Sequence, residues 1–374
     1  MKNNHLTWIE IDKKALLSNL SAFTNLVGKK VEVMPVVKSN AYGHGLAEVV
    51  GIIKNKVKTL CVVNVEEGLN LRKLGFKKRI VVLGFYNENN LAAGIKKDIE
   101  LPIYTEKQLQ IIAATAKKIK RSAKVHIKID TGNSRLGKLP KDFLTFFNKI
   151  TQEKSIKVVG LYSHFSSSED ENLSFTNKQL QRYSEIIAKL PRNNFRYHIG
   201  CSASTLNVPT SYFSAVRIGI GLYGLWPSNF TKQRTKSKNG FSLQPVLSLK
   251  SKIIQIKEVP AGSYIGYSRT KKVKQKTKVA VVPVGYYDGL DRLLSNNGEV
   301  TIQNKRCPII GNICMNMFMV NATKLKNVKE GEVVTIIGQN QKAGPIADEI
   351  AKRTKTINYE VVTRLNPTIQ RIVK

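Results

Sequence analysis

Apolar and polar residues follow one another in a repeated order of strand, loop and helix over the first two thirds of the chain. Short apolar runs rich in β-branched residues predict strands, and apolar residues at helical spacing predict the helices between them. Eight such strands are predicted, at 31–38, 59–64, 79–84, 99–104, 124–130, 156–163, 195–199 and 215–220. Helices are predicted between most of them, for example at 65–74, 106–118 and 177–190. This alternation predicts an α/β fold, a (β/α)8 barrel of the TIM type.

A doubly wound parallel sheet is the alternative α/β fold. It usually carries a glycine-rich phosphate turn, GxGxxG, after its first strand. The sequence has no GxGxxG motif there, so the barrel is favoured.

The pattern changes after residues 228–242 (SNFTKQRTKSKNGFS), a polar, basic stretch that is typical of a linker. Beyond it, closely spaced strands are predicted at 246–256, 278–284, 299–303 and 332–337, with one helix near 345–353. The sequence therefore predicts a barrel domain at 12–230 and a mainly-β domain at 240–374.

The formal net charge of +35 raises the question of an anionic partner. However, the basic residues are spread along the whole chain. The densest cluster, at 271–278 (KKVKQKTK), lacks interleaved aromatic residues and any known nucleic-acid motif. Nucleic-acid binding is therefore not favoured, and the charge is interpreted as a bias of solvated positions.

The amino end lacks the apolar core of a signal peptide, and no apolar run approaches the ~18 residues that a membrane span needs. We therefore expect a cytoplasmic protein without a membrane partner. The four cysteines form no CxxC pair, and the five histidines are scattered, so no metal site is expected.

Lys38 stands at the carboxyl end of the predicted strand 31–38, where the turn formers Ser39, Asn40 and Gly43 follow. Ligands gather at this edge of α/β folds. A desolvated lysine there becomes a usable nucleophile, commonly for an imine with a carbonyl substrate or with pyridoxal phosphate (PLP). With 61 Lys and Arg residues in the chain, a surface lysine is the alternative.

The stretch VVKSNAYGHG around Lys38 resembles the PLP-lysine motif of the alanine racemase family. The resemblance implies that Lys38 carries PLP and that Tyr42 contacts its phosphate. It also implies a mainly-β second domain that the first strand, within residues 1–11, joins.

Further stretches resemble motifs of this family in the family's order. IGYS makes Tyr267 the second acid/base, supplied by the partner subunit, and LYSHFSS makes His164 the histidine that polarises this tyrosine. In VRIGIGLYG, Arg217 corresponds to the arginine facing the pyridine nitrogen.

The resemblance also implies a phosphate cradle and a substrate anchor. The cradle comprises the backbone N–H groups of Gly219 and Ile220, the hydroxyl of Ser202 in HIGCSAS, and the phenols of Tyr42 and Tyr359. The substrate carboxylate is anchored by Arg135 in KIDTGNSRLG and by the backbone N–H of Met315 in ICMN. Lys128 matches a lysine that is often carbamylated and then orients the arginine.

Some positions depart from the family pattern. Asn316 occupies the position of the family's usual aspartate, and Asn312 that of a common arginine. Asn133-Ser134 replaces the usual Met-Gly, and Gly200-Cys201 replaces Ala-Asn. A neutral Asn316 is expected to widen the range of substrates.

The resemblance implies a PLP-dependent racemase that interconverts L-alanine and D-alanine by two-base proton transfer and supplies D-alanine for peptidoglycan. Since Lys38 and Tyr267 meet only when two chains join, a homodimer with shared active sites is implied. The alternatives are a serine or broad-specificity racemase, and a non-catalytic PLP-binding protein.

Overall fold

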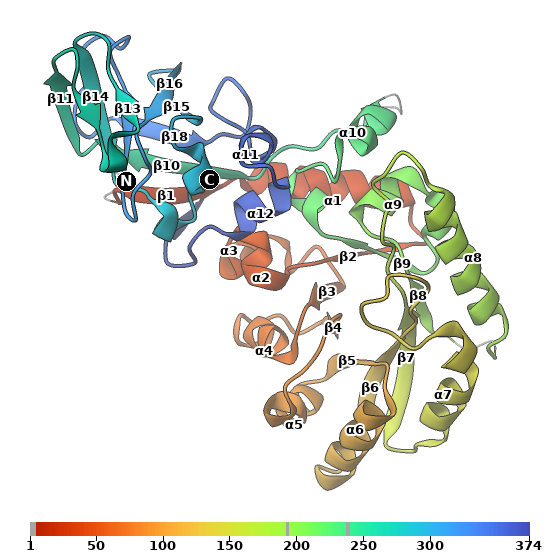
Figure 1. The fold of residues 1–374 in the computed structure, drawn as a ribbon. Coiled ribbons are helices and arrows are strands. Elements are labelled where there is room, and N and C mark those ends of the chain that lie inside the picture. Colours follow the sequence, from red (N-terminus) through yellow and green to blue (C-terminus); the bar gives the residue numbers. More distant parts are fainter. Residues whose placement is uncertain (1–4, 192–193, 237–239) are drawn as a thin grey trace. The chain divides into compact units, whose positions relative to one another are not determined.

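The computed structural model describes residues 5–191, 194–236 and 240–374. They form two compact units (Figure 1). The barrel unit comprises residues 17–39 and 49–243, and the β unit comprises residues 1–16, 40–48 and 244–374. Within the described residues, no helix is long and apolar enough to cross a bilayer.

Eight parallel strands make up the centre of the barrel unit. They are β2 (Glu32–Pro35), β3 (Thr59–Val62), β4 (Arg79–Val82), β5 (Ile99–Ile103), β6 (Ala123–Lys128), β7 (Ile156–Tyr162), β8 (Arg196–His198) and β9 (Ala215–Ile218). Each falls within one of the eight predicted strand regions or starts one residue before it. Near-continuous burial along β3 and β5 is typical of strands covered on both faces.

The eight strands close into the predicted (β/α)8 barrel. Strands β3 to β8 form one sheet, and β2 pairs with β9. A parallel bridge between Val36 and Cys61 continues β2 toward β3. On the other side, the Ser214 N–H donates to the Tyr197 carbonyl at 3.1 Å and joins β9 to β8.

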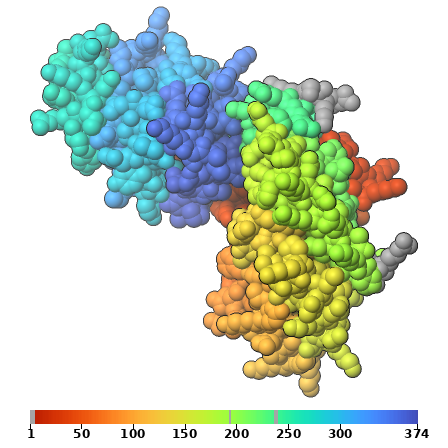
Figure 2. All heavy atoms as spheres, turned by 45° about the vertical axis from the view of Figure 1, so that its right-hand side comes forward, coloured from red at the N-terminus to blue at the C-terminus, as the bar shows by residue number. Residues whose placement is uncertain are grey.

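Helices cover the outside of the barrel. The helices between residues 13 and 236, apart from the short α2, are α1 (Lys13–Val27), α3 (Leu46–Ile53), α4 (Val65–Lys73), α5 (Glu88–Lys96), α6 (Glu106–Lys118), α7 (Pro140–Gln152), α8 (Ser174–Ala188), α9 (Ser202–Asn207) and α10 (Asn229–Lys236). Figure 2 shows α7 and α8, yellow to green, on the outer face of the barrel unit. The predicted helices at 65–74, 106–118 and 177–190 are confirmed.

The predicted linker is wrong over most of its length, because α10 occupies residues 229–236. Two threonines anchor this helix: Thr231 and Thr235 are buried, and the Asn207 side-chain amide donates to the Thr231 hydroxyl at 2.9 Å. The polar composition of the stretch concealed these two contacts. Residues 237–239 of the predicted linker lie outside the described residues.

A nine-stranded sheet dominates the β unit, in the order β11-β14-β17-β16-β15-β18-β10-β1-β19. Its strands are β1 (Thr7–Ile11), β10 (Leu247–Lys252), β11 (Gln255–Val259), β14 (Thr277–Val282), β15 (Glu299–Ile302), β16 (Lys305–Ile310), β17 (Phe318–Asn321), β18 (Val333–Ile337) and β19 (Gln370–Val373). A two-stranded ribbon, β12 (Tyr264–Ile265) with β13 (Lys271–Lys272), and helices α11 (Ala347–Thr354) and α12 (Asn358–Thr363) complete it.

The single strand predicted at 246–256 is two strands, because the chain leaves β10 after Lys252 and begins β11 at Gln255. Ile253 between them is buried, so the apolar pattern continues through the break and hides it. The predicted helix near 345–353 is confirmed as α11.

Candidate active site

Lys38 begins α2 (Lys38–Tyr42), three residues after the buried end of β2. Burial lowers the pKa of its amine, and the charges of Arg135 and Arg217 lower it further, while the Glu67 carboxylate opposes them. An amine with a lowered pKa is deprotonated more often near neutral pH. Lys38 is therefore suited to act as a nucleophile and as a proton acceptor.

The turn after Lys38 is left-handed. The φ angles of Ser39 to Tyr42 lie at 55°, 53°, 52° and 54°, a conformation that costs roughly 1–2 kcal/mol per non-glycine residue. The Ser39 N–H donates to the Glu67 carboxylate at 2.6 Å, and the Leu46 N–H donates to Asn40 Oδ1 at 2.8 Å. These two bonds support a backbone that local preference alone does not favour.

Arg217 lies on β9 and is only 4% exposed. Its Nη1 donates to His198 Nδ1 at 2.7 Å and to the His198 carbonyl at 2.9 Å. Its Nη2 faces the carbonyls of Ser163 at 2.8 Å and Ile199 at 3.0 Å, and His164 Nδ1 at 3.2 Å. Within the described part of the chain, these bonds all use the two terminal nitrogens. The Nε–H donor therefore remains for a ligand.

Lys128, the last residue of β6, is 6% exposed. Burial and the neighbouring guanidinium groups of Arg217 and Arg135 lower the pKa of Lys128 to about 7, against the opposing effect of Asp130. The amine is therefore neutral in a large fraction of molecules near neutral pH.

Asp130 shapes the loop that presents Arg135. Its Oδ1 accepts the backbone N–H groups of Gly132, Asn133 and Ser134 at 3.0, 2.9 and 3.1 Å. Such an Asx turn fixes the backbone directly after the strand. The exposed Arg135 follows this turn by one residue.

His164 follows the end of β7 by two residues. Burial lowers its pKa, and the charges of Arg217, Lys128, Arg135 and Lys38 lower it further. His164 is therefore neutral.

We call the four basic side chains that act on His164 the cation cluster (Lys38, Lys128, Arg135, Arg217). The cluster lies in the barrel unit, at the carboxyl ends of the strands, and is suited to an anionic ligand.

Ser202 and the turn after β9 form a compact backbone cradle. The Ser202 hydroxyl oxygen accepts the N–H groups of Gly219 at 3.0 Å and Gly221 at 3.3 Å. A Cβ at Gly221 would lie 2.6 Å from a ring carbon of Phe23, so only glycine fits there. Ile220, between the two glycines, begins a short 3-10 helix.

The remaining predicted site residues lie in the β unit. The rings of Tyr42 and Tyr359 pack with their centroids 6.3 Å apart. Tyr267 is 72% exposed and Met315 is 54% exposed. Asn312, which stands for the family's arginine, donates to the Tyr267 carbonyl at 3.2 Å and so holds the tyrosine turn.

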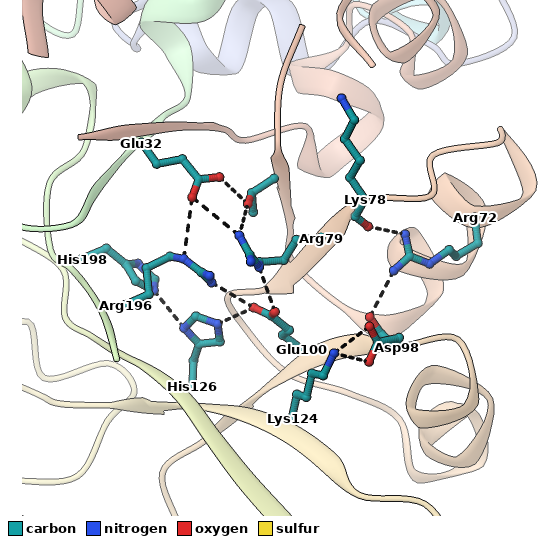
Figure 3. A network of polar contacts seen from close by, with 11 residues as sticks. Glu32, Arg72, Lys78, Arg79, Asp98, Glu100, Lys124, His126, Arg196 and His198 are labelled. Atoms are coloured by element: carbon teal, nitrogen blue, oxygen red, sulfur yellow. Dashed lines mark hydrogen bonds and ion pairs between the residues drawn. The ribbon is translucent and has the colours of Figure 1, made fainter. Parts of the chain in front are cut away.

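The sequence did not reveal a buried polar network that continues from Arg217 into the barrel. Figure 3 draws its members Glu100, His126 and His198. The imidazoles of His126 and His198 are fully buried. Two signals were available. Glu100 is a single carboxylate in an apolar strand. His126 precedes Lys128 by two positions on one strand, so His126 and Lys128 lie on the same face of that strand. The distances between strands could not be inferred from the sequence.

Fold and site together define a (β/α)8-barrel protein with a cation cluster, suited to an anionic ligand, at the carboxyl ends of its strands and an added β unit. Two family models match the chain: "Alanine racemase, N-terminal domain" over residues 11–227 and "Alanine racemase, C-terminal domain" over residues 246–373. The chain belongs to the alanine racemase family.

Relatives and solved structures agree with this assignment. The alanine racemase of Leptospira interrogans is 38% identical over 100% of this chain and 97% of its own length. That of Methanococcus maripaludis is 35% identical over 99% of both chains. The structure of the alanine racemase of Clostridium difficile 630 matches with a TM-score of 0.94 at 32% identity, over 100% of this chain and 97% of its own.

Proposed function

We propose that this protein is a PLP-dependent racemase that interconverts L-alanine and D-alanine. The observation that supports it most directly is the cation cluster, in which a lysine of lowered pKa lies within electrostatic reach of two arginines. Together with the family, this arrangement favours an anionic cofactor and an amino-acid carboxylate as ligands.

The donor set fits PLP. The cofactor phosphate carries negative charge and strong acceptors, and the cradle would offer it the N–H of Ile220 and the hydroxyl proton of Ser202. The Gly219 N–H, which the sequence assigned to the phosphate, donates to the Ser202 hydroxyl oxygen at 3.0 Å. The phenols of Tyr42 and Tyr359 would add donors to the same phosphate. The Nε of Arg217 would face the ring nitrogen and, since arginine only donates, would keep that nitrogen unprotonated.

Two residues would handle the α-proton. When bound, PLP withdraws electrons from the amino-acid Cα and so makes its proton more acidic. Lys38 would hold the cofactor and exchange the proton on one face of the Cα. Tyr267 would exchange it on the other face, with His164 as its polarising neighbour. Because the two groups act on opposite faces, the centre is inverted.

Arg135 and Met315 would anchor the substrate carboxylate. The forked guanidinium of Arg135 suits a planar carboxylate, and the exposed Met315 would add its backbone N–H. Neutral Asn316 beside Met315 is the reason to include serine among the substrates tested.

We propose a homodimer in which Tyr267 and Met315 complete the partner's site. Large exposed apolar side chains in the β unit support a covered face there: Tyr264, Tyr267, Tyr286, Tyr287, Met315 and Met317. The proposed role is the supply of D-alanine for peptidoglycan, in the cytoplasm.

The test is proton exchange in D2O with added PLP and L-alanine. Loss of the α-proton matched by appearance of D-alanine is expected, and Tyr267→Phe is expected to lower the rate from the L side by about 10²-fold or more. The exposed Tyr264→Phe serves as the matched control and should retain activity. Exchange with retained configuration would contradict the role of Tyr267, and PLP binding without any exchange of alanine or serine would contradict a racemase.

A further inference from the structure

The guanidinium of Arg217 is buried without a carboxylate contact among the described residues. Its acceptors are carbonyl oxygens and imidazole nitrogens. A buried charge is costly unless polar groups compensate it. The question is therefore what lies behind the imidazole of His198, which makes the shortest of these contacts at 2.7 Å.

Behind His198, a chain of three hydrogen bonds runs through the barrel interior, and Figure 3 draws the part that joins His198, His126 and Glu100. The chain of bonds begins where Arg217 Nη1 meets His198 Nδ1. His198 Nε2 lies 3.0 Å from His126 Nδ1, and His126 Nε2 lies 2.7 Å from Glu100 Oε2. His198, His126 and Glu100 come from β8, β6 and β5, and they are 0%, 0% and 5% exposed.

The direction of every bond in this chain follows from its two ends. Arginine can only donate, so His198 Nδ1 must accept and its proton must sit on Nε2. That proton is donated to His126 Nδ1, so the proton of His126 must also sit on Nε2, where the Glu100 carboxylate accepts it. Both imidazoles are therefore neutral Nε2–H tautomers, since a second proton on either ring would face another N–H.

Glu100 is held in its ionised form by neighbouring arginines. Arg79 Nε lies 3.1 Å from Oε1, and Arg196 Nη1 lies 3.4 Å from Oε2. Burial raises the pKa of Glu100, but the hydrogen bond from His126 and these two charges outweigh burial and lower it. Burial lowers the pKa of both histidines.

The surrounding side chains are shaped around the two imidazoles. The ring of Tyr162 stacks on His198 at 7° with centroids 5.2 Å apart, and the Tyr162 hydroxyl donates to the Leu83 carbonyl at 2.8 Å. A Cβ at Gly160 would lie 2.3 Å from His126 Nδ1, so glycine makes room for that ring. The rings can therefore shift little, and proton position is their main remaining freedom.

We infer that Glu100 is a positioning residue for Arg217: through His126 and His198 it fixes the tautomer that accepts from the guanidinium, and so fixes the guanidinium that would face the cofactor ring nitrogen. This inference rests on the cofactor role proposed above for Arg217. Glu100 touches neither substrate nor cofactor in it.

The test compares Glu100→Gln with the matched variant Glu32→Gln. Glu32 contacts the same two arginines, at 3.6 and 3.7 Å, and accepts from the Thr59 hydroxyl, but it is not bonded to His126. In Glu100→Gln, the amide NH2 must face either an arginine donor or the Nε2–H of His126. In the molecules where it faces His126, the Nε2 of that ring must accept, and the uniform direction of the chain of bonds is lost.

The first readout is the position of the imidazole protons in the cofactor-free protein, from 15N NMR of labelled histidine. We expect neutral Nε2–H tautomers for His126 and His198 in the wild-type protein and in Glu32→Gln, and mixed tautomers in Glu100→Gln. Unchanged tautomers in Glu100→Gln, or an Nδ1–H tautomer of His198 in the wild-type protein, would overturn the inference.

The second readout uses the protein loaded with PLP. Glu100→Gln is expected to lower kcat about tenfold, as for coupled groups in one network, with an unchanged KM for alanine and an altered pH dependence of the cofactor absorption. In a His126→Asn background, which removes the bond to Glu100, Glu100→Gln should cause no further loss. If the losses of kcat in Glu100→Gln and His126→Asn are additive, or if Glu32→Gln loses as much kcat as Glu100→Gln, the role of Glu100 is structural only.

If Glu100→Gln does not fold, Glu100→Asp is used in its place. Glu100→Asp keeps the negative charge but shortens the reach of the carboxylate to His126. Tautomers and a kcat equal to those of the wild-type protein would then contradict the inference. A wild-type protein that shows the expected tautomers but neither binds PLP nor racemises alanine would contradict the proposed function instead. In that case the chain of bonds stands without a role toward the cofactor.

Discussion

Lys128 illustrates how burial changes the chemistry of a single residue. It ends a barrel strand among other cations, and its pKa of about 7 leaves much of the amine neutral near physiological pH. A neutral amine can react with CO2 to give a carbamate, whereas an ammonium cannot. The product is an anion, which would reverse the repulsion between Lys128 and Arg135.

We predict that Lys128 is carbamylated in bicarbonate buffer. Because only the neutral amine reacts, the modified fraction should rise as the pH increases through about 7. Native mass spectrometry should show one CO2 adduct per chain, which acidification removes. Lys128→Ala should lack the adduct. The control Lys138→Ala should keep it, since Lys138 is paired with Glu106 at 3.0 Å.

At the scale of single residues, the positions of Lys38, Arg217 and Lys128 near the ends of buried barrel strands were predictable from the motifs that contain them. The Glu100 network was not predictable, because Glu100 and His126 are 26 positions apart and His126 and His198 are 72 positions apart. They meet only once β5, β6 and β8 have assembled into one sheet. Likewise, the sequence does not show that Asn312 holds the carbonyl of Tyr267, since that contact depends on a turn with positive φ at Gly266.

Among the elements, the left-handed turn after Lys38 departs most from local preference. The turn formers predicted a loop there, but not four successive residues with positive φ. For helix α10, the prediction of a linker failed because the polar composition concealed a helix that two buried threonines anchor. In both elements, contacts distant in sequence outweigh composition, whereas the barrel strands follow their apolar pattern.

Gly43, at the end of the left-handed turn, is expected to be intolerant of a side chain. Its φ is 80°, and a Cβ there would lie 1.9 Å from the Val362 carbonyl oxygen. Gly331→Ala is the control in the same unit, because φ is 86° but no atom lies within 4 Å of its Cβ. We predict a cost of about 1 kcal/mol for Gly331→Ala.

For Gly43→Ala we predict a cost of about 3 kcal/mol, because the backbone must also shift. Urea unfolding followed by circular dichroism measures both variants. Equal losses of stability would show that φ alone, and not the approach of the carbonyl, requires glycine at position 43.

For the whole molecule, the proposed shared site predicts complementation between two inactive chains. As homodimers, Lys38→Ala should be inactive and Tyr267→Phe should keep at most about 1% of the wild-type rate from the L side. When both chains are co-expressed, half of the dimers are mixed and each holds one intact site, so activity should return to about a quarter of the wild-type value. No recovery in isolated mixed dimers would mean that Lys38 and Tyr267 serve the same chain's site.

The order in which the ribosome makes the chain has a consequence for the β unit. Strand β1 is translated first, yet its two neighbours in the sheet, β10 and β19, begin at Leu247 and Gln370. At roughly 5–20 residues per second, β1 waits on the order of tens of seconds for its second partner. The barrel strands, from Glu32 to Ile218, have all emerged before the sheet can close. The nascent chain must therefore keep the apolar strand β1 from pairing wrongly until β19 has been made, and removing β19 would leave β1 as an open edge.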